Sequence, residues 1–534
     1  MDGTRERRRV RLARTGLVVA VIAGAGALAS PSTSTGVEPA RAAAPVQAEQ
    51  AEQAARAIRR PNIVFFLTDD MATSHLRHMP ATRRLIFDRG ARFTDYYTNI
   101  SLCCPARASL LTGKYAHNTG IIGNEFPDGF HGFHRGDERR RTFAVALRRQ
   151  GGYRTSLIGK YLNEYPFVDS APRHAVRPTF VPPGWSDWAV PVRGQFEGTS
   201  YDINLNGRIR HREAPANYLG DFMTRRAVRQ IRANRDDRGL AIVLSFYGPH
   251  EPAPAAPAER RNAALQRRIA QVRYPRTADF NERDVSDKPR FIRDNRRMGP
   301  RTRRAMDRIY RRQLLSVASI DRHVRVVVRA LRRTRQLDDT YLVFTSDHGI
   351  HLGNHRLLPG KNTAYVTDSH VPFAIRGPGI RAGSVVRRVT GPIDIAPTFA
   401  DMANVSLPWV RDGASVLPLA KGRSPEDWRS WILVRRGRAK GGSARAVSEP
   451  LMRAEARRVG AGWFRGVIGS RWRYVRYGTG EQELYDDRVD PHQLRNIMAL
   501  PVAERTAEQV AALRRARRAV RALTACAGVA DCRR

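Results

Sequence analysis

The residues best suited to chemistry lie within one short stretch, residues 101–117, which reads SLCCPARASLLTGKYAH. It contains a guanidinium at Arg107, an ammonium at Lys114 and an imidazole at His117. Groups of these types hold a tetrahedral oxyanion and transfer protons around it. The stretch therefore predicts a site where such an anion is bound and processed.

Two adjacent thiols precede these groups. Pro105 restricts the backbone beside Cys103 and Cys104, so a thiol there can be held at a turn. The leucines that follow indicate a helix from about Ala106, with its N-terminus toward the bound anion. On composition alone, a buried cysteine pair beside an ordinary surface helix explains these residues equally well.

Three apolar runs each end in acids or histidines, namely 61–70 (PNIVFFLTDD), 240–250 (LAIVLSFYGPH) and 340–349 (TYLVFTSDHG). Continuous apolar runs of this length are typical of strands buried on both faces. In open α/β sheets, ligand sites form beyond the carboxyl ends of such strands. The runs bring five candidate residues to that edge: Asp69, Asp70, His250, Asp347 and His348. Lys361, in the loop after the third run, is a further candidate contact for an anion, although a single lysine is more often just solvated.

Helical patterns separate these strands. Apolar residues recur at helical spacing over 304–335, and a shorter helix is expected over 142–150. Alternating strands and helices predict an α/β sandwich. Residues 251–301 are rich in proline and charge, which indicates an extended surface excursion. From about residue 405 the pattern changes to strands over 431–434, 463–477 and 483–487, a further helix over 502–524, and hence a small C-terminal subdomain.

The totals of the chain give weaker constraints. Its 534 residues are enough for a substantial core, and its formal charge of +43 predicts attraction to polyanions. An arginine-rich genome composition explains the same charge, so it identifies no partner, and we expect no specific nucleic acid. Cys526 and Cys532 are close enough in sequence to form a disulfide in an oxidising compartment, which we predict.

The N-terminus predicts export. A basic run, a short apolar run and small residues form a secretory signal over 1–44, followed by a linker over 45–60. The remaining chain divides into a catalytic domain over 61–404 and the C-terminal subdomain over 405–534. The protein is therefore expected to be secreted, or held at the cell surface if the apolar run is retained, with no transmembrane span in the mature chain.

Several motifs together resemble the type I sulfatases, of the alkaline-phosphatase-like superfamily. They are CCPAR (103–107), TDD (68–70), GKYLNE (159–164), PH (249–250), DVSDKP (284–289), SDHG (346–349) and RGPG (376–379). The double cysteine, GKYLNE and DHG are most similar to the N-acetylglucosamine-6-sulfatase branch. The family pattern more often has serine where this chain has Ala106. The resemblance implies a large mixed sheet between helices and a smaller C-terminal antiparallel sheet.

The resemblance also implies a modified nucleophile and a metal. A formylglycine-generating enzyme would convert Cys103 to Cα-formylglycine, whose hydrated aldehyde attacks the substrate. A divalent cation would be held by Asp69, Asp70, Asp347 and His348 together with position 103. Oxygen ligands favour Ca²⁺. Many sulfatases have asparagine where this chain has His348, and a nitrogen ligand leaves Zn²⁺ or Mn²⁺ as alternatives.

The implied reaction is hydrolysis of sulfate monoesters, including those of sulfated sugars such as N-acetylglucosamine 6-sulfate. In this hypothesis Arg107 and the cation activate position 103, and Lys114 and Lys361 neutralise the sulfuryl oxygens. His250 protonates the leaving alcohol, and His117 then takes a proton so that sulfate is expelled.

Two other functions stay open at this point. One is a metal-dependent phosphodiesterase or phosphonate monoester hydrolase of the same superfamily, using His348 in a more zinc-like site. The other is a non-enzymatic protein that binds polyanions through its positive surface.

Overall fold

The computed structural model describes residues 60–166, 176–234, 239–252, 255–437 and 462–533. The predicted signal and all but the last residue of the predicted linker lie outside these ranges. Among the helices within them, none combines the length and the apolar character that crossing a bilayer requires.

The described residues form a ten-stranded mixed sheet with the order β10-β2-β9-β8-β1-β7-β3-β4-β5-β6. Its strands are β1 (Asn62–Asp69), β2 (Ala91–Phe93), β3 (Arg154–Gly159), β4 (Asp187–Arg193), β5 (Ser200–Leu205), β6 (Arg208–Glu213), β7 (Leu240–Pro249), β8 (Thr340–Ser346), β9 (Phe373–Arg376) and β10 (Ser384–Val386). At its centre, β1 pairs in parallel with both β7 and β8, and β3 pairs in parallel with β7. The carboxyl ends of these four strands therefore meet at one edge.

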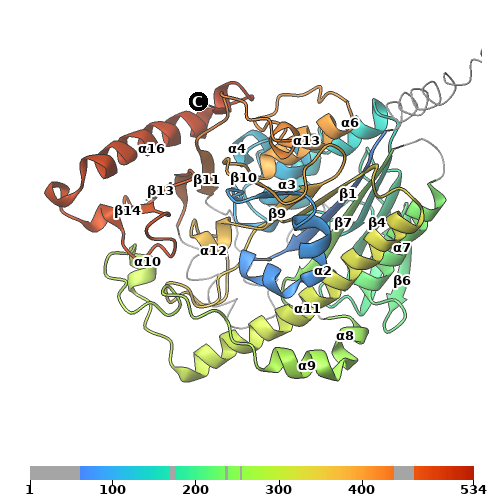
Figure 1. Ribbon diagram of the computed structural model, residues 1–534, viewed down its shortest axis with the longest axis horizontal. Helices are drawn as coiled ribbons and strands as arrows, with labels where there is room; N and C mark the ends of the chain where they lie inside the picture. The colour runs from blue at the N-terminus through green and yellow to red at the C-terminus, as the bar shows by residue number, and fades with distance from the viewer. Residues whose placement is uncertain (1–59, 167–175, 235–238, 253–254, 438–461, 534) are drawn as a thin grey trace, which may run out of the picture. The chain divides into compact units, whose positions relative to one another are not determined.

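Helices cover both faces of this sheet, as Figure 1 shows. Val64 and Phe66 of β1 pack into a core with α7 (Leu219–Ala233) and α11 (Pro300–Arg333). Phe65 of the same strand points the other way, into a core with α3 (Cys103–Thr112), α6 (Phe143–Arg149) and α13 (Ile395–Met402). Burial on both faces explains why the strand reads as one continuous apolar run. The predicted α/β sandwich is confirmed.

Two details of the prediction are wrong. Helix α3 begins at Cys103, and not at Ala106, so Cys103 itself is the first residue of the helix. Residues 251–301 are also less extended than expected, because they contain α8 (Pro257–Arg261), α9 (Ala263–Ala270) and α10 (Arg290–Arg293). These helices are too short to show a clear period in the sequence. The other short helices are α2 (Pro80–Thr82), α4 (Ala116–Thr119), α5 (Gly129–Arg135), α12 (Val366–Ser369) and α14 (Leu417–Ala420).

The C-terminal region forms a four-stranded antiparallel sheet with the order β11-β12-β13-β14. Its strands are β11 (Ile432–Arg436), β12 (Phe464–Ile468), β13 (Trp472–Tyr477) and β14 (Gln482–Asp486), and α16 (Ala507–Ala525) packs on them. A disulfide joins Cys526 and Cys532 just after α16. The predicted antiparallel sheet and the predicted disulfide are both confirmed.

Candidate active site

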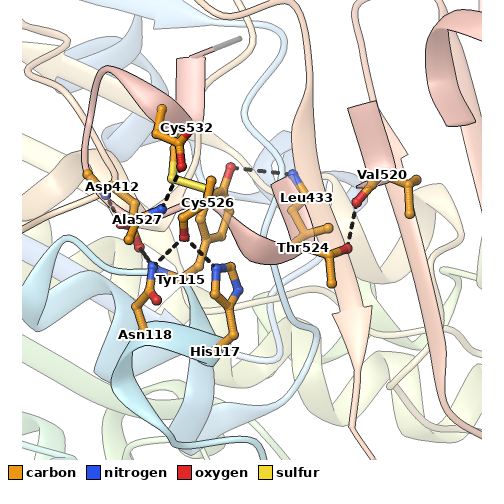
Figure 2. Close-up of a disulfide and its surroundings, with 12 residues drawn as sticks. Tyr115, His117, Asn118, Asp412, Leu433, Val520, Thr524, Cys526, Ala527 and Cys532 are labelled. Carbon is orange, nitrogen blue, oxygen red and sulfur yellow. Dashed lines mark hydrogen bonds between the residues drawn. A yellow bond between two sulfur atoms is a disulfide. The ribbon is translucent and has the colours of Figure 1, made fainter. Parts of the chain in front are cut away.

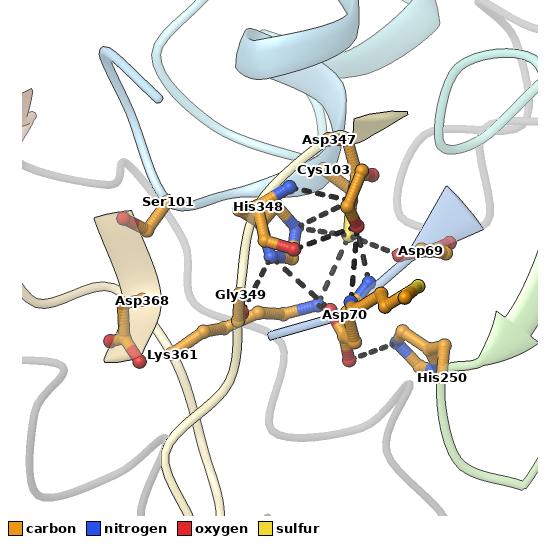
Figure 3. A network of polar contacts seen from close by, with 12 residues as sticks. Asp69, Asp70, Ser101, Cys103, His250, Asp347, His348, Gly349, Lys361 and Asp368 are labelled. Atoms are coloured by element: carbon orange, nitrogen blue, oxygen red, sulfur yellow. Dashed lines mark hydrogen bonds and ion pairs between the residues drawn. The ribbon is translucent and has the colours of Figure 1, made fainter. Parts of the chain in front are cut away.

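The acids and histidines at the strand ends come together in one buried cluster (Figure 3). Asp69 is the last residue of β1, and Asp70 follows it with a φ of 61°, in the left-handed region. A non-glycine residue held there is strained, which is common at functional sites. Asp347 follows β8, and His250 follows β7. The parallel pairing of β1 with β7 and β8 is what brings these distant residues to one place.

Cys103 points into the same cluster from the start of α3. Its Sγ lies 3.1 Å from Lys361 Nζ, 3.4 Å from His348 Nε2 and 3.7 Å from Asp69 Oδ1. Burial opposes ionisation of this thiol, but the lysines at 160 and 361 outweigh burial and lower its pKa. The Cys103 thiol thus has both cationic and acidic side chains around it.

The cluster suits a divalent cation. Ligand atoms of Asp69, Cys103, Asp347 and His348 all lie within 4.8 Å of one another. Asp70 Oδ2 is buried and accepts no hydrogen bond, with His250 Nε2 lying 3.7 Å away. Burial opposes a charge on His348, yet Asp347 and then Cys103 raise the imidazole pKa to about 9. Three buried carboxylates with an unfilled oxygen are a donor set that attracts positive charge, and they fit a metal.

Arg107 contacts two of the carboxylates of the cluster. Its Nε donates to Asp347 Oδ2 at 2.9 Å, and another guanidinium nitrogen is 3.5 Å from Asp69 Oδ2. A third contact goes to Ser245 Oγ on β7 at 2.7 Å. The guanidinium is buried, so it fixes the orientation of two candidate metal ligands.

Lys160 is a member of this cluster that the sequence analysis did not select. It follows β3, the fourth parallel strand, and its Nζ forms an ion pair with Asp69. Burial opposes ionisation of Asp69, but Lys160 and then Arg107 hold the carboxyl pKa well below its usual range. The sequence signal for this strand is weak, because Lys160 is preceded by only two consecutive apolar residues, Leu157 and Ile158, after the polar Thr155 and Ser156.

Lys361 is held in place by its own loop. Its Nζ donates to Asp70 Oδ1 at 2.7 Å. Two residues later, Thr363 donates its backbone N–H and its hydroxyl to Asp368, and its carbonyl accepts a hydrogen bond from Ser101. Beside this loop is a cavity of about 310 Å³, lined in part by Phe291, Asn362, Thr363, Phe464 and Tyr477.

The structure corrects the placement of two predicted site residues. Lys114 Nζ pairs with Glu138 at 2.9 Å, and not with the Cys103 cluster. His117 Nε2 donates to the carbonyl of Cys526 at 3.0 Å, next to the C-terminal disulfide (Figure 2). Their closeness to Cys103 in sequence was misleading, because α3 carries the chain away from the cluster over its length of 10 residues. These two side chains anchor the segment to neighbouring elements.

Comparison with known proteins agrees with this geometry. A protein-family model described as Sulfatase matches residues 61–405. The chain belongs to the sulfatase family. Human N-acetylglucosamine-6-sulfatase is 32% identical over 399 residues, which cover 73% of this chain and 69% of that protein. The sulfatase family resemblance found in the motifs is therefore confirmed.

Other members of the sulfatase family are similar over part of their length. The Drosophila melanogaster extracellular sulfatase SULF-1 homolog is 34% identical over 412 residues, which cover 75% of this chain and 35% of that protein. The putative extracellular sulfatase of Caenorhabditis elegans is matched over 52% of its length. This chain thus spans between a third and about half of these two relatives.

Solved structures show the same fold. A protein in complex with its substrate D-glucosamine-2-N,6-O-disulfate aligns with a TM-score of 0.66 and 23% identity, covering 85% of this chain and 96% of that one. A phosphonate monoester hydrolase from Silicibacter pomeroyi aligns with a TM-score of 0.64 and 21% identity, covering 87% and 95%. At these identities the likeness establishes the architecture alone.

Proposed function

We propose that this chain hydrolyses sulfate monoesters, with position 103 acting as formylglycine and a divalent cation bound beside it. The observation that carries the proposal is the position of Cys103, whose Sγ lies 3.1 Å from Lys361 and within reach of Asp69 and His348. The proposed metal ligands are Asp69, Asp70, Asp347 and His348 with position 103, and the oxygen-rich set favours Ca²⁺. A bound cation would supply positive charge for the nucleophile and the sulfuryl oxygens.

Formylglycine hydrated by one water molecule would supply two hydroxyls on one carbon, one to attack sulfur and one to lose a proton when sulfate leaves and the aldehyde is restored. The chain's own residues prepare that chemistry. Lys361 and Lys160 place two ammonium groups at the cluster, and Arg107 holds the carboxylates of the cluster in position. We assign to Lys160 the charge-neutralising role that the sequence analysis gave to Lys114.

His250 is the proposed proton donor to the leaving alcohol. Burial lowers its pKa, and Asp70 Oδ2 at 3.7 Å opposes that shift. An arriving sulfate ester adds negative charge, which favours the protonated imidazole. After donating, the neutral ring can take a proton from position 103, the step first assigned to His117. One histidine at the cluster can thus serve both transfers.

The proposed substrates are sulfated sugars, with N-acetylglucosamine 6-sulfate as the first choice. This rests on the name of the human relative at 32% identity. The cavity of about 310 Å³ beside Lys361 offers aromatic and polar side chains to a sugar ring. We also propose an extracellular location, as the printed names of the fly and worm relatives indicate for those proteins.

Two measurements test the proposal. Peptide mass analysis is expected to show formylglycine at position 103 when the protein is produced with a formylglycine-generating enzyme. Desulfation assays on N-acetylglucosamine 6-sulfate, chondroitin-type fragments and aryl sulfates are expected to give turnover that Cys103→Ala abolishes. An unmodified thiol with faster hydrolysis of phosphonate esters would favour the phosphonate hydrolase instead. Full sulfatase turnover by Cys103→Ala would refute the proposed nucleophile.

A further inference from the structure

A strongly basic cleft lies outside the active-site cluster, between the first half of α11 and the segment that follows α9. Its volume is about 560 Å³. Six arginines line it, together with Pro300 and one acid, Asp307: Arg273, Arg276, Arg303, Arg304, Arg308 and Arg311. We call it the arginine cleft.

Two of these arginines are fixed by the fold. Arg276 binds both oxygens of Asp307, at 2.8 and 2.7 Å, and its guanidinium lies 4.1 Å from the centre of the Phe280 ring. Arg311 Nε donates to the carbonyl of Val272 at 2.7 Å. The one acid of the cleft is thereby already engaged, and it also accepts from the backbone of Tyr274 at 2.9 Å.

The remaining four arginines keep their charge directed at the cleft. Arg273, Arg303, Arg304 and Arg308 are exposed or nearly so, and no carboxylate of the described chain pairs with them. Arg304 and Arg308 are four residues apart on one helix, a spacing at which like charges repel. This local excess of positive charge favours the binding of an anion.

The lining also indicates which polyanion fits. Guanidinium groups pair with sulfate oxygens through two parallel hydrogen bonds. No aromatic side chain lines the cleft for stacking of bases, which single-stranded nucleic acids require. Among the described residues, the exposed large hydrophobic side chains are Val410, Val489 and Val502, so the cleft has no apolar rim for a membrane.

We propose that the arginine cleft is a second binding site for a sulfated segment of a glycan chain, separate from the site of hydrolysis. The choice of a glycan rests on the proposed function. The segment that lines one side of the cleft contacts the loop that follows His348. The Tyr274 hydroxyl donates to Asn354 Oδ1 at 2.8 Å, and Phe280 forms an isolated antiparallel β-bridge with Asn354, six residues after His348. A polymer held in the cleft would stay bound next to a segment that contacts the active-site loop.

The test compares two variants with the same change of charge. Arg304→Gln/Arg308→Gln alters the cleft, and Arg514→Gln/Arg518→Gln alters two exposed arginines with the same spacing on α16. The cleft variant is expected to bind a heparin hexasaccharide about a hundredfold more weakly by calorimetry, since each of the two lost charged hydrogen bonds is worth roughly a factor of ten. The α16 variant is expected to bind as the unchanged protein does.

Hydrolysis of a small aryl sulfate serves as the internal control, and both variants are expected to retain it. Equal weakening by both variants would overturn the proposal, because net charge alone would then explain binding. If the cleft variant loses affinity for a single-stranded DNA of matched charge by the same factor as for heparin, the choice of a glycan is overturned. If no sulfate ester is hydrolysed while the cleft variant still loses heparin, the proposed function fails and the cleft stands.

Discussion

The lysines at positions 114 and 160 give a direct test of the active-site assignment. Lys160 pairs with Asp69 in the cluster, whereas Lys114 pairs with Glu138 away from it. Lys160→Ala is expected to lower kcat by ~10²–10³-fold, as the loss of one preorganised charge does elsewhere. Lys114→Ala is expected to keep kcat and lose ~2–3 kcal/mol of stability, because it leaves Glu138 buried with fewer partners. Steady-state kinetics and thermal unfolding of both variants decide; the reverse pattern would restore the sequence-based assignment.

A second residue-scale prediction concerns the metal. Asp69, Asp70 and Asp347 are buried together, so a cation that relieves their repulsion should stabilise the folded protein. Ca²⁺ is expected to raise the Tm of chelator-treated protein by several degrees, and to raise that of Asp347→Asn much less. Glu426→Gln, far along the chain and outside the cluster, should respond as the unchanged protein does. Equal Tm shifts in all three proteins would show that the ion acts elsewhere.

The sequence allowed some residues of the site to be predicted and concealed others, for a physical reason. Asp69, Asp347 and His250 could be found because each lies at the carboxyl end of an apolar strand, and parallel strands bring their ends to one edge. Lys114 and His117 lie outside the cluster, because closeness to Cys103 in sequence does not imply closeness in space. The position of a side chain beyond a helix depends on the path of that helix, which composition does not reveal.

At the scale of elements, the short 3-10 helix η1 (Thr73–His78) is fastened to α11 by a buried histidine. His75 Nε2 lies 3.1 Å from Gln313 Oε1, and Nδ1 lies 3.1 Å from the Ala72 carbonyl. Burial lowers the pKa of this imidazole to about 4, although both hydrogen bonds oppose the shift. Because the unfolded chain binds the proton first, this residue removes stability as the pH falls from about 6.5 toward 4.

The expected size of this effect is about 2 kcal/mol between pH 7.5 and pH 5. His75→Gln keeps polar contacts but does not titrate, so its free energy of unfolding should depend less on pH in that interval. The measurement is denaturant unfolding of both proteins at the two pH values. The same pH dependence in both would mean that His75 is already protonated in the folded state.

Helices and strands were predicted well where they were long. The 34-residue helix α11 shows its period clearly, and β1, β7 and β8 read as apolar runs. The four-residue helix α10 gives too few turns to show a period. Strand β3 was missed because polar Thr155 and Ser156 are buried in it, bonded to neighbouring polar groups.

At the scale of the whole molecule, the C-terminal sheet is attached to the loop that carries Lys361. Glu483 of β14 accepts a hydrogen bond from Tyr365 at 2.6 Å, four residues after that lysine. Arg473 of β13 donates to the carbonyl of Ala364 at 2.6 Å and to Ser369 Oγ at 2.8 Å. These contacts are buried, so the second sheet acts as a support for the active-site loop.

Variants of two tyrosines distinguish positioning of the active-site loop from a general contribution to stability. Tyr365 and Tyr485 each donate to the Glu483 carboxylate at 2.6 Å, but Tyr365 belongs to the active-site loop and Tyr485 to the C-terminal sheet. Each change to phenylalanine is expected to cost ~1.5–3 kcal/mol of stability, as the loss of a hydrogen bond to a charged group does. Only Tyr365→Phe is expected to lower kcat, by about tenfold, because a shift of the loop misplaces Lys361. Thermal unfolding and kinetics on both variants test this. If the two variants keep the same kcat, the C-terminal sheet stabilises the protein without positioning its active site.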